Sequence, residues 1–70
     1  MDKRVKEALE AVCSEQKDGF AKTYASAALD YNMIGHELYV QCLYVLSNLQ
    51  YWRGARAREV KAILKGVSKQ

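Results

Sequence analysis

The segment from His36 to Trp52 constrains the fold most, because it is the most apolar stretch of the chain. Every residue from Leu38 to Leu46 is apolar except Gln41. Two stripes with helical spacing run through it, one formed by Leu38, Cys42, Val45, Leu49 and Trp52 and the other by Tyr39, Leu43 and Leu46. A helix that is apolar around most of its circumference needs cover on more than one side. The segment therefore predicts the central helix of a small bundle.

The rest of the chain predicts three further helices. The 70 residues include no proline and four glycines, which favours helices separated by glycine turns over a sheet. Asp2 is suited to cap the first helix and Asp18 the second, and Asn32 is suited to a left-handed turn before the third. We therefore expect an all-α fold with residues 1–70 in a single domain, a small four-helix bundle with helices over about residues 2–16, 20–31, 36–52 and 55–66.

The second predicted helix carries two kinds of apolar surface. Its stripe with helical spacing consists of Phe20, Tyr24, Ala27, Ala28 and Tyr31. Ala21 and Ala25 flank this stripe, and small side chains allow a neighbouring helix to approach closely. We expect this helix to pack closely against the others.

The apolar surplus of the third predicted helix suggests association. A chain of 70 residues buries only a thin core, and small helical chains commonly gain stability from a homodimer or a permanent partner. The sequence leaves the choice between monomer and homodimer open. The chain is also rich in tyrosine, which is enriched at interfaces. Tyr44 lies off both stripes of its helix, so it marks an interface if it is exposed and belongs to the core if the bundle buries it.

The positive charge is concentrated in the last third of the chain. The net charge is +3, but residues 51–70 contain six basic residues against Glu59 alone, so this part carries +5. Such asymmetry indicates an anionic partner, either nucleic acid or an acidic protein surface, or else a helix face that only meets solvent.

The segment from Tyr51 to Lys61 breaks a local rule of helix formation. Helix starts prefer acidic residues, yet three arginines crowd the start of the last predicted helix, where each costs about 0.3 kcal/mol against the helix dipole. Such a violation is expected where a partner compensates for it, and guanidinium groups beside free N–H groups can bind a phosphate or a carboxylate. The candidate residues for binding a partner or an anion are Arg53, Arg56, Arg58, Lys61 and Lys65, and the candidate interface aromatics are Tyr44, Tyr51 and Trp52.

Two other interpretations of this segment stay open. In the first, Arg53 and Arg56 pair with Asp30 or Glu37 inside the fold and Trp52 belongs to the core. In the second, the last two helices form a helix-turn-helix, because a glycine turn precedes a basic helix. The long apolar helix before the turn argues against that motif. Binding of DNA or RNA is therefore the alternative to binding of a protein.

The sequence contains no catalytic constellation. It has no glycine-rich phosphate loop and no Cys-x-x-Cys, and no nucleophile or acid is evident near His36. We expect no enzyme activity, no catalytic residue, no metal and no cofactor. Cys13 and Cys42 fall on apolar stripes and are expected to be core thiols. The chain shows neither a signal peptide nor a run of about 18 apolar residues, so we expect a cytoplasmic protein that does not enter the membrane.

Two segments, KDGFAKTYASAAL and LYVLSNLQYWRGARAREVKAILK, resemble small helical proteins of unassigned function encoded in bacteriophages and prophages. The similarity covers about the last 50 residues and is centred on the SNLQYWRG joint. The resemblance implies a phage accessory protein that acts in the bacterial host cell by binding a host or phage macromolecule. Inhibition of a defence complex such as a CRISPR effector is one role that it implies. It assigns no functional residue.

Overall fold

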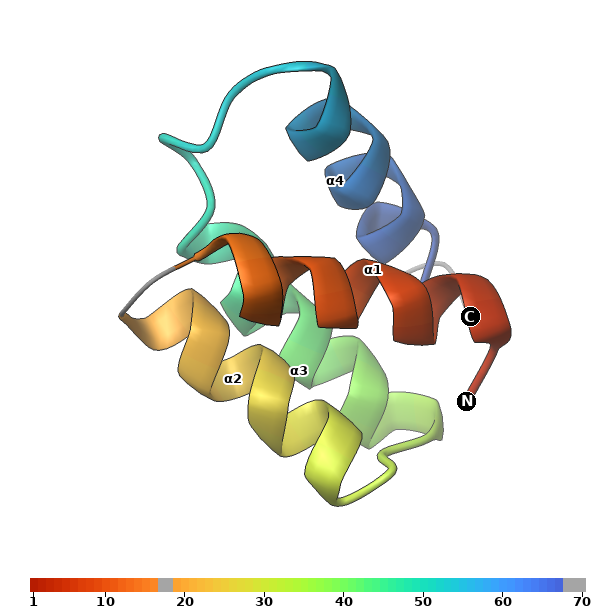
Figure 1. Ribbon diagram of the computed structural model, residues 1–70. Coiled ribbons are helices and arrows are strands. Elements are labelled where there is room, and N and C mark those ends of the chain that lie inside the picture. The colour runs from red at the N-terminus through yellow and green to blue at the C-terminus, as the bar shows by residue number, and fades with distance from the viewer. Residues whose placement is uncertain (17–18, 68–70) are drawn as a thin grey trace.

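The computed structural model describes residues 1–16 and 19–67. These residues form four helices and no strand: α1 (Lys3–Glu15), α2 (Phe20–Asp30), α3 (Gly35–Ser47) and α4 (Ala55–Val67) (Figure 1). The prediction of an all-α, four-helix fold is confirmed. The predicted capping role of Asp18 lies outside the described residues.

The four helices pack as a ring. α2 and α3 lie side by side as a hairpin, α1 packs against α2, and α4 packs against both α3 and α1 (Figure 1). The end of α1 lies beside the start of α4, because Glu15 pairs with Arg56. The start of α1 lies beside the end of α4, because Val5 and Val67 line the same pocket. These two helices are therefore antiparallel. α3 forms one side of this ring. The sequence predicted a central position for it, because its residues are apolar around most of the helix circumference. Part of its circumference therefore remains open to solvent.

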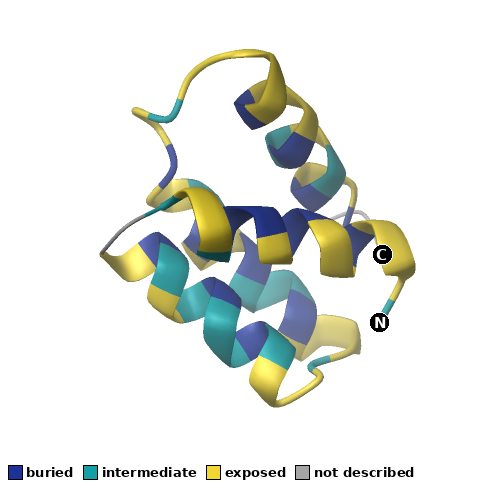
Figure 2. Cartoon of the chain, in the orientation of Figure 1, coloured by how far each residue is buried: buried dark blue, intermediate teal, exposed yellow. Residues whose placement is uncertain are grey.

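α1 begins and packs as its sequence predicts. The backbone N–H of Arg4 donates a 2.7 Å hydrogen bond to the carboxylate of Asp2, which caps the helix. Leu9 and Val12 are completely buried, and the other side of the helix is exposed (Figure 2). Burying such a side chain contributes about 1.5–3 kcal/mol, so α1 supplies a substantial share of the core.

The buried face of α2 is formed by its small residues. Ala21, Ala25 and Ala28 are buried, whereas Phe20 and Tyr31 at the two ends of the aromatic stripe are exposed. Because alanine side chains are short, α2 can approach both α1 and α3 closely. The flank that the sequence indicated as a site of close approach thus lies on the core face together with Ala28. Of the aromatic residues of the stripe, Tyr24 is partly buried against the core, and Phe20 and Tyr31 lie outside.

The prediction that the third helix extends to residue 52 is wrong, because α3 ends at Ser47. Ser47 Oγ and Asn48 Nδ2 each donate a 2.8 Å hydrogen bond to the carbonyl four residues back. The backbone N–H groups of Asn48 and Leu49 then bond to carbonyls three residues back, which tightens the final turn and ends the helix. Leu49 is nevertheless buried. The apolar periodicity therefore continues beyond the end of the helix.

A left-handed residue shapes the turn between α2 and α3. Asn32 has a φ of 48°, as the sequence predicted. The backbone N–H groups of Asn32 and Met33 bond back to Leu29 and Ala28 at 3.1 Å, which satisfies carbonyls at the end of α2. The turn reverses the chain within a few residues, so that α3 returns along α2.

Both cysteines are free thiols, Cys42 buried and Cys13 half-buried. Cys13 Sγ lies 3.6 Å from Ser26 Oγ, and this contact joins α1 to α2. Cys42 belongs to the core of α3. The prediction of core thiols is confirmed for Cys42 and holds in part for Cys13. None of the described helices is both long enough and apolar enough to cross a membrane.

Alkaline pH is expected to destabilise the fold through Cys42. Burial raises the pKa of its thiol from 9.0 to about 11. The folded chain therefore keeps this proton when the unfolded chain loses it, so stability is full below pH 9 and falls as the pH rises toward 11. We expect a loss of roughly 2 kcal/mol from this group, seen as a larger fall in the free energy of urea unfolding between pH 8 and 10.5 in the natural chain than in Cys42→Ala. Equal pH dependence in the two chains would contradict this assignment.

Candidate anion-binding site

The connection between α3 and α4, residues 48–54, carries the first part of the predicted site. It is mostly exposed (Figure 2), but it is anchored at Leu49, which is buried in the core. The backbone N–H of Trp52 donates a 3.0 Å hydrogen bond to the carbonyl of Leu49. The Trp52 side chain is partly buried and packs against the core. The anchored turn thus fixes where Trp52 and the residues after it can lie.

Gly54 sets the direction in which the chain enters α4. Its φ is 112°, a conformation that residues with a side chain rarely adopt. Its carbonyl accepts the first helical hydrogen bond, from the N–H of Arg58 at 3.0 Å. The arginines on either side of this glycine are thereby brought to the same end of the helix.

A hydrogen bond joins α4 to the connection that precedes it. Lys61 Nζ donates to the carbonyl oxygen of Trp52 at 2.6 Å, and Lys61 is partly buried. Next to this bond lies a pocket of about 220 Å³. We call it the basic pocket, and its lining residues are Trp52, Arg53, Gly54, Ala57, Arg58 and Lys61. Three of the five predicted cationic residues are therefore brought together beside the one tryptophan.

The two guanidinium groups of the basic pocket have no carboxylate partner within residues 1–16 and 19–67. Arg53 and Arg58 are exposed, and in that part of the chain neither makes an ion pair. The alternative in which Arg53 pairs with Asp30 or Glu37 is therefore wrong for the described residues. Two positive charges without a counter-charge, next to a helix start that itself favours anions, create a positive potential at the pocket.

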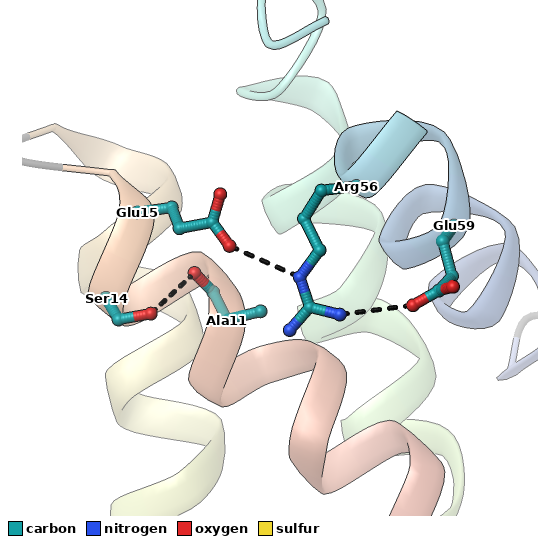
Figure 3. Close-up of polar contacts among 5 residues, drawn as sticks. All are labelled: Ala11, Ser14, Glu15, Arg56 and Glu59. Carbon is teal, nitrogen blue, oxygen red and sulfur yellow. Dashed lines mark hydrogen bonds and ion pairs between the residues drawn. The ribbon is translucent and has the colours of Figure 1, made fainter. Parts of the chain in front are cut away.

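Arg56 is not part of the basic pocket. Its Nε donates to Glu15 Oε2 at 3.2 Å and its Nη1 to Glu59 Oε1 at 3.1 Å, as Figure 3 shows. One interpretation of the sequence was that Arg56 makes an ion pair within the fold, and it does. Its partners are Glu15 and Glu59, whereas the sequence suggested Asp30 or Glu37. All three side chains are between 40% and 65% exposed, so each ion pair contributes little stability. Their effect at the site is to neutralise this arginine.

The other predicted site residues lie apart from the pocket. Lys65 is in the last turn of α4 and does not line it. Tyr51 is the most exposed large apolar residue described, at 86%, and it precedes the pocket tryptophan in the chain. Tyr44 is on α3, where its ring contacts that of Tyr24 with 5.2 Å between centroids, and it is 49% exposed. Tyr44 is therefore exposed and not part of the core, and its role at an interface stays a prediction.

Trp52 packs against the core, as one of the two interpretations of the sequence held, and it also lines the basic pocket. Its role in binding stays a prediction. The Lys61 hydrogen bond to its carbonyl could not be read from the sequence, because nothing in the spacing of the two residues indicates it. The ion pair to Glu15 was missed for the same reason. It depends on the end of α1 meeting the start of α4.

The connection between α3 and α4 does not have the form of a helix-turn-helix. That motif joins its helices by a turn of about 3–4 residues. Here residues 48–54 separate the two helices, and Leu49 within them is buried in the core. The helix-turn-helix interpretation is therefore wrong. Any contact between the basic pocket and nucleic acid would not follow the geometry of that motif.

The described residues offer little that suggests metal or acid–base chemistry. The part of the chain that the structure describes has no group of three His, Cys, Asp or Glu side chains placed to hold a metal ion. His36 is exposed at the start of α3, where its ring contacts Tyr39.

Comparison with protein-family models, with curated proteins and with solved structures gave no match. The fold and the site together define a small all-α protein with a basic, tryptophan-lined pocket at one end of its ring of helices.

Proposed function

We propose that this chain is a non-enzymatic interaction protein whose basic pocket binds an acidic surface of a host or phage protein. The observation that carries the proposal is the convergence of Arg53, Arg58 and Trp52 on one pocket in which the two arginines have no described carboxylate partner. Arginine presents a planar fork of N–H donors that matches a carboxylate, and tryptophan and arginine are the residue types that most often dominate protein interfaces.

The arrangement suits recognition of a carboxylate better than chemical transformation of one. Lys61 is held by the carbonyl of Trp52, so it keeps the pocket in shape while its charge remains nearby. Asp or Glu side chains of a partner could then accept hydrogen bonds from Arg53 and Arg58, while Tyr51, the residue before Trp52 in the chain, offers an exposed ring. In the bacterial cytoplasm, masking an acidic surface of a defence complex such as a CRISPR effector would be one outcome, in keeping with the resemblance to phage proteins.

A second candidate function is binding of DNA or RNA. The exposed ring of Tyr51, one residue before the pocket tryptophan in the chain, and two arginines without a described carboxylate partner favour it, because bases stack on aromatic rings while guanidinium groups contact phosphates. The small number of cationic side chains at the basic pocket argues against it. Among the described residues these are Arg53, Arg58 and Lys61, and Arg56, outside the pocket, is neutralised by two glutamates. The pocket therefore offers few phosphate contacts, and its affinity would be weak and sensitive to salt.

We expect the tagged chain to retain a protein from bacterial lysate after nuclease treatment, and the variant Arg53→Ala/Arg58→Ala to retain at least about 10-fold less. Each lost charge-assisted contact costs about 1.5–3 kcal/mol, and 1.4 kcal/mol is a factor of ten. The control is Lys3→Ala/Lys6→Ala, which removes the same charge from the exposed side of α1. Quantitative mass spectrometry of the eluates is the measurement.

Three outcomes separate the alternatives. Loss in the arginine variant alone supports the proposal. Equal loss in both variants would show that only net charge matters and would contradict it. Nucleic acid in the untreated eluate, with every protein lost on digestion, would favour the second candidate.

A further inference from the structure

The basic pocket carries more positive charge than one carboxylate can balance. The described residues that line it include three cations, Arg53, Arg58 and Lys61, and no acidic residue. A single carboxylate of a partner would leave two of these positive charges unbalanced, whereas a doubly charged group would leave only one. The charge of the pocket therefore favours an acidic group with a second negative charge.

Lys61 contributes both charge and unused hydrogen-bond donors to the pocket. Its ammonium group has three N–H donors, and the structure gives it one acceptor, the carbonyl oxygen of Trp52 at 2.6 Å. Within the described part of the chain, no carboxylate pairs with Lys61. A bond to a neutral carbonyl fixes the position of the ammonium group and leaves its positive charge in place. The remaining donors are available to a ligand in the pocket.

The arrangement of the donors suits a phosphate monoester. Such a group carries a charge of about −1.5 to −2 near pH 7 and three strong acceptor oxygens, whereas a carboxylate carries one charge and two oxygens. Arg53 belongs to the connection before α4, and Arg58 and Lys61 lie three positions apart on α4 itself, on one side of the helix. A tetrahedral phosphoryl group can accept hydrogen bonds from both elements at once.

The size of the pocket suits a charged group that projects from a larger molecule. Its volume of about 220 Å³ is below the range of roughly 300–1,000 Å³ that is typical of sites enclosing a whole small molecule. Trp52 lines the same pocket and offers apolar surface to the carbon atoms that carry the charged group. A phosphorylated side chain on the surface of a protein meets both conditions.

We propose that Lys61 makes the basic pocket selective for a phosphate monoester, carried by a phosphorylated side chain of the partner, over a carboxylate. This inference rests on the proposed function, in which the pocket meets an acidic surface of another protein. Arg53 and Arg58 supply the part of the binding that any anion shares. Lys61 adds the third positive charge, which a doubly charged group balances better than a singly charged one.

Titration of the whole chain with small anions at constant ionic strength tests the proposal. The probes are N-acetyl-phosphoserine amide, N-acetyl-glutamic acid amide, diethyl phosphate as a singly charged phosphodiester, and inorganic phosphate. Trp52 is the only tryptophan, so its indole N–H gives a single NMR signal that reports on the pocket. We expect the phosphoserine probe to reach half-saturation at a concentration at least about 10-fold lower than the glutamate or diester probe, because it gains an additional charge-assisted contact.

Lys61→Met is the variant that addresses selectivity, because it keeps the aliphatic stem and removes the charge. We expect it to reduce the preference for the phosphoserine probe over the glutamate probe to less than about 3-fold. Loss of the hydrogen bond to Trp52 alone would weaken the binding of all probes by the same factor and leave this ratio unchanged. Lys3→Met makes the same change on α1, away from the pocket, and is expected to keep the ratio of the natural chain.

Several results would overturn the proposal. These are equal half-saturation by the phosphoserine and glutamate probes, an unchanged ratio in Lys61→Met, no shift of the indole signal with any probe, and tightest binding of the diester or of inorganic phosphate. Tightest binding of the diester would point to a nucleic-acid backbone, and that of inorganic phosphate to a free ion.

Failure of this inference can be distinguished from failure of the proposed function. If the probes bind equally but Arg53→Ala/Arg58→Ala still loses a protein from lysate, the proposed function stands and the inference is wrong. If the phosphoserine probe binds selectively but no protein is retained from lysate, the selectivity of the pocket is supported and the proposed function is contradicted.

Discussion

Leu49→Ala is expected to lower the free energy of unfolding by about 2–4 kcal/mol. Leu49 lies outside every helix, in the connection after α3, yet it is 1% exposed. Removing its side chain leaves a cavity in the core and also releases the anchor of the connection that carries Trp52. For a domain of this size such a loss is a large fraction of the total stability. Urea unfolding followed by circular dichroism measures it.

Leu43→Ala is the matched control for this prediction. Leu43 lies in the middle of α3 on an apolar stripe, so the sequence alone ranks it as a core residue at least as strongly as Leu49. The structure leaves it 39% exposed. Its replacement is expected to cost less than about 1 kcal/mol when both variants are measured in dilute solution. A larger cost for Leu43→Ala than for Leu49→Ala would show that α3 is oriented differently from the structure described.

Ala25→Leu is expected to cost about 1–3 kcal/mol, or to prevent folding, because it forces three extra carbon atoms into a packed interface. Ala25 is completely buried on the face of α2 that meets α1 and α3. Leucine has a helix propensity close to that of alanine, so the cost reports on packing and not on the helix itself. Thermal and urea unfolding both measure it.

The matched control is Ala27→Leu, which makes the same change two residues further on, at a half-buried position on the aromatic side of α2. We expect it to cost less than half as much as Ala25→Leu. The reverse order would mean that the aromatic stripe faces the core.

The fold class could be predicted because three helices carry a single apolar stripe or an unmistakable apolar run. In α1 and α4 the residues with helical spacing, such as Leu9 and Leu64, are the ones that are buried. The orientation of α2 could not be predicted in the same way. Both its aromatic stripe and its alanine flank are apolar, and the choice between them depends on how closely α1 and α3 approach, which is a property of the whole fold.

The sequence predicted where in the chain the candidate site lies, but not which of the basic residues line it. The basic residues around Gly54 stand out in the sequence because they oppose the helix dipole. Arg56 is neutralised by two glutamates. Its pair with Glu59, three positions on in the same helix, could have been predicted from the spacing. Its pair with Glu15, on another helix and 41 positions away, could not, because local spacing contains no information about it.

The ring of helices also has a consequence for the order in which the chain folds. Three of the four packed helix pairs join consecutive helices, and only the pair of α1 and α4 joins distant parts of the chain. Contacts between neighbours in sequence form with little loss of chain entropy, whereas closing a long loop costs more. The seam between α1 and α4 is therefore expected to form last. Substitutions along this seam, for example at Val60, which is buried on α4 and lines a pocket together with Ala8 of α1, would then speed unfolding and leave the rate of folding nearly unchanged.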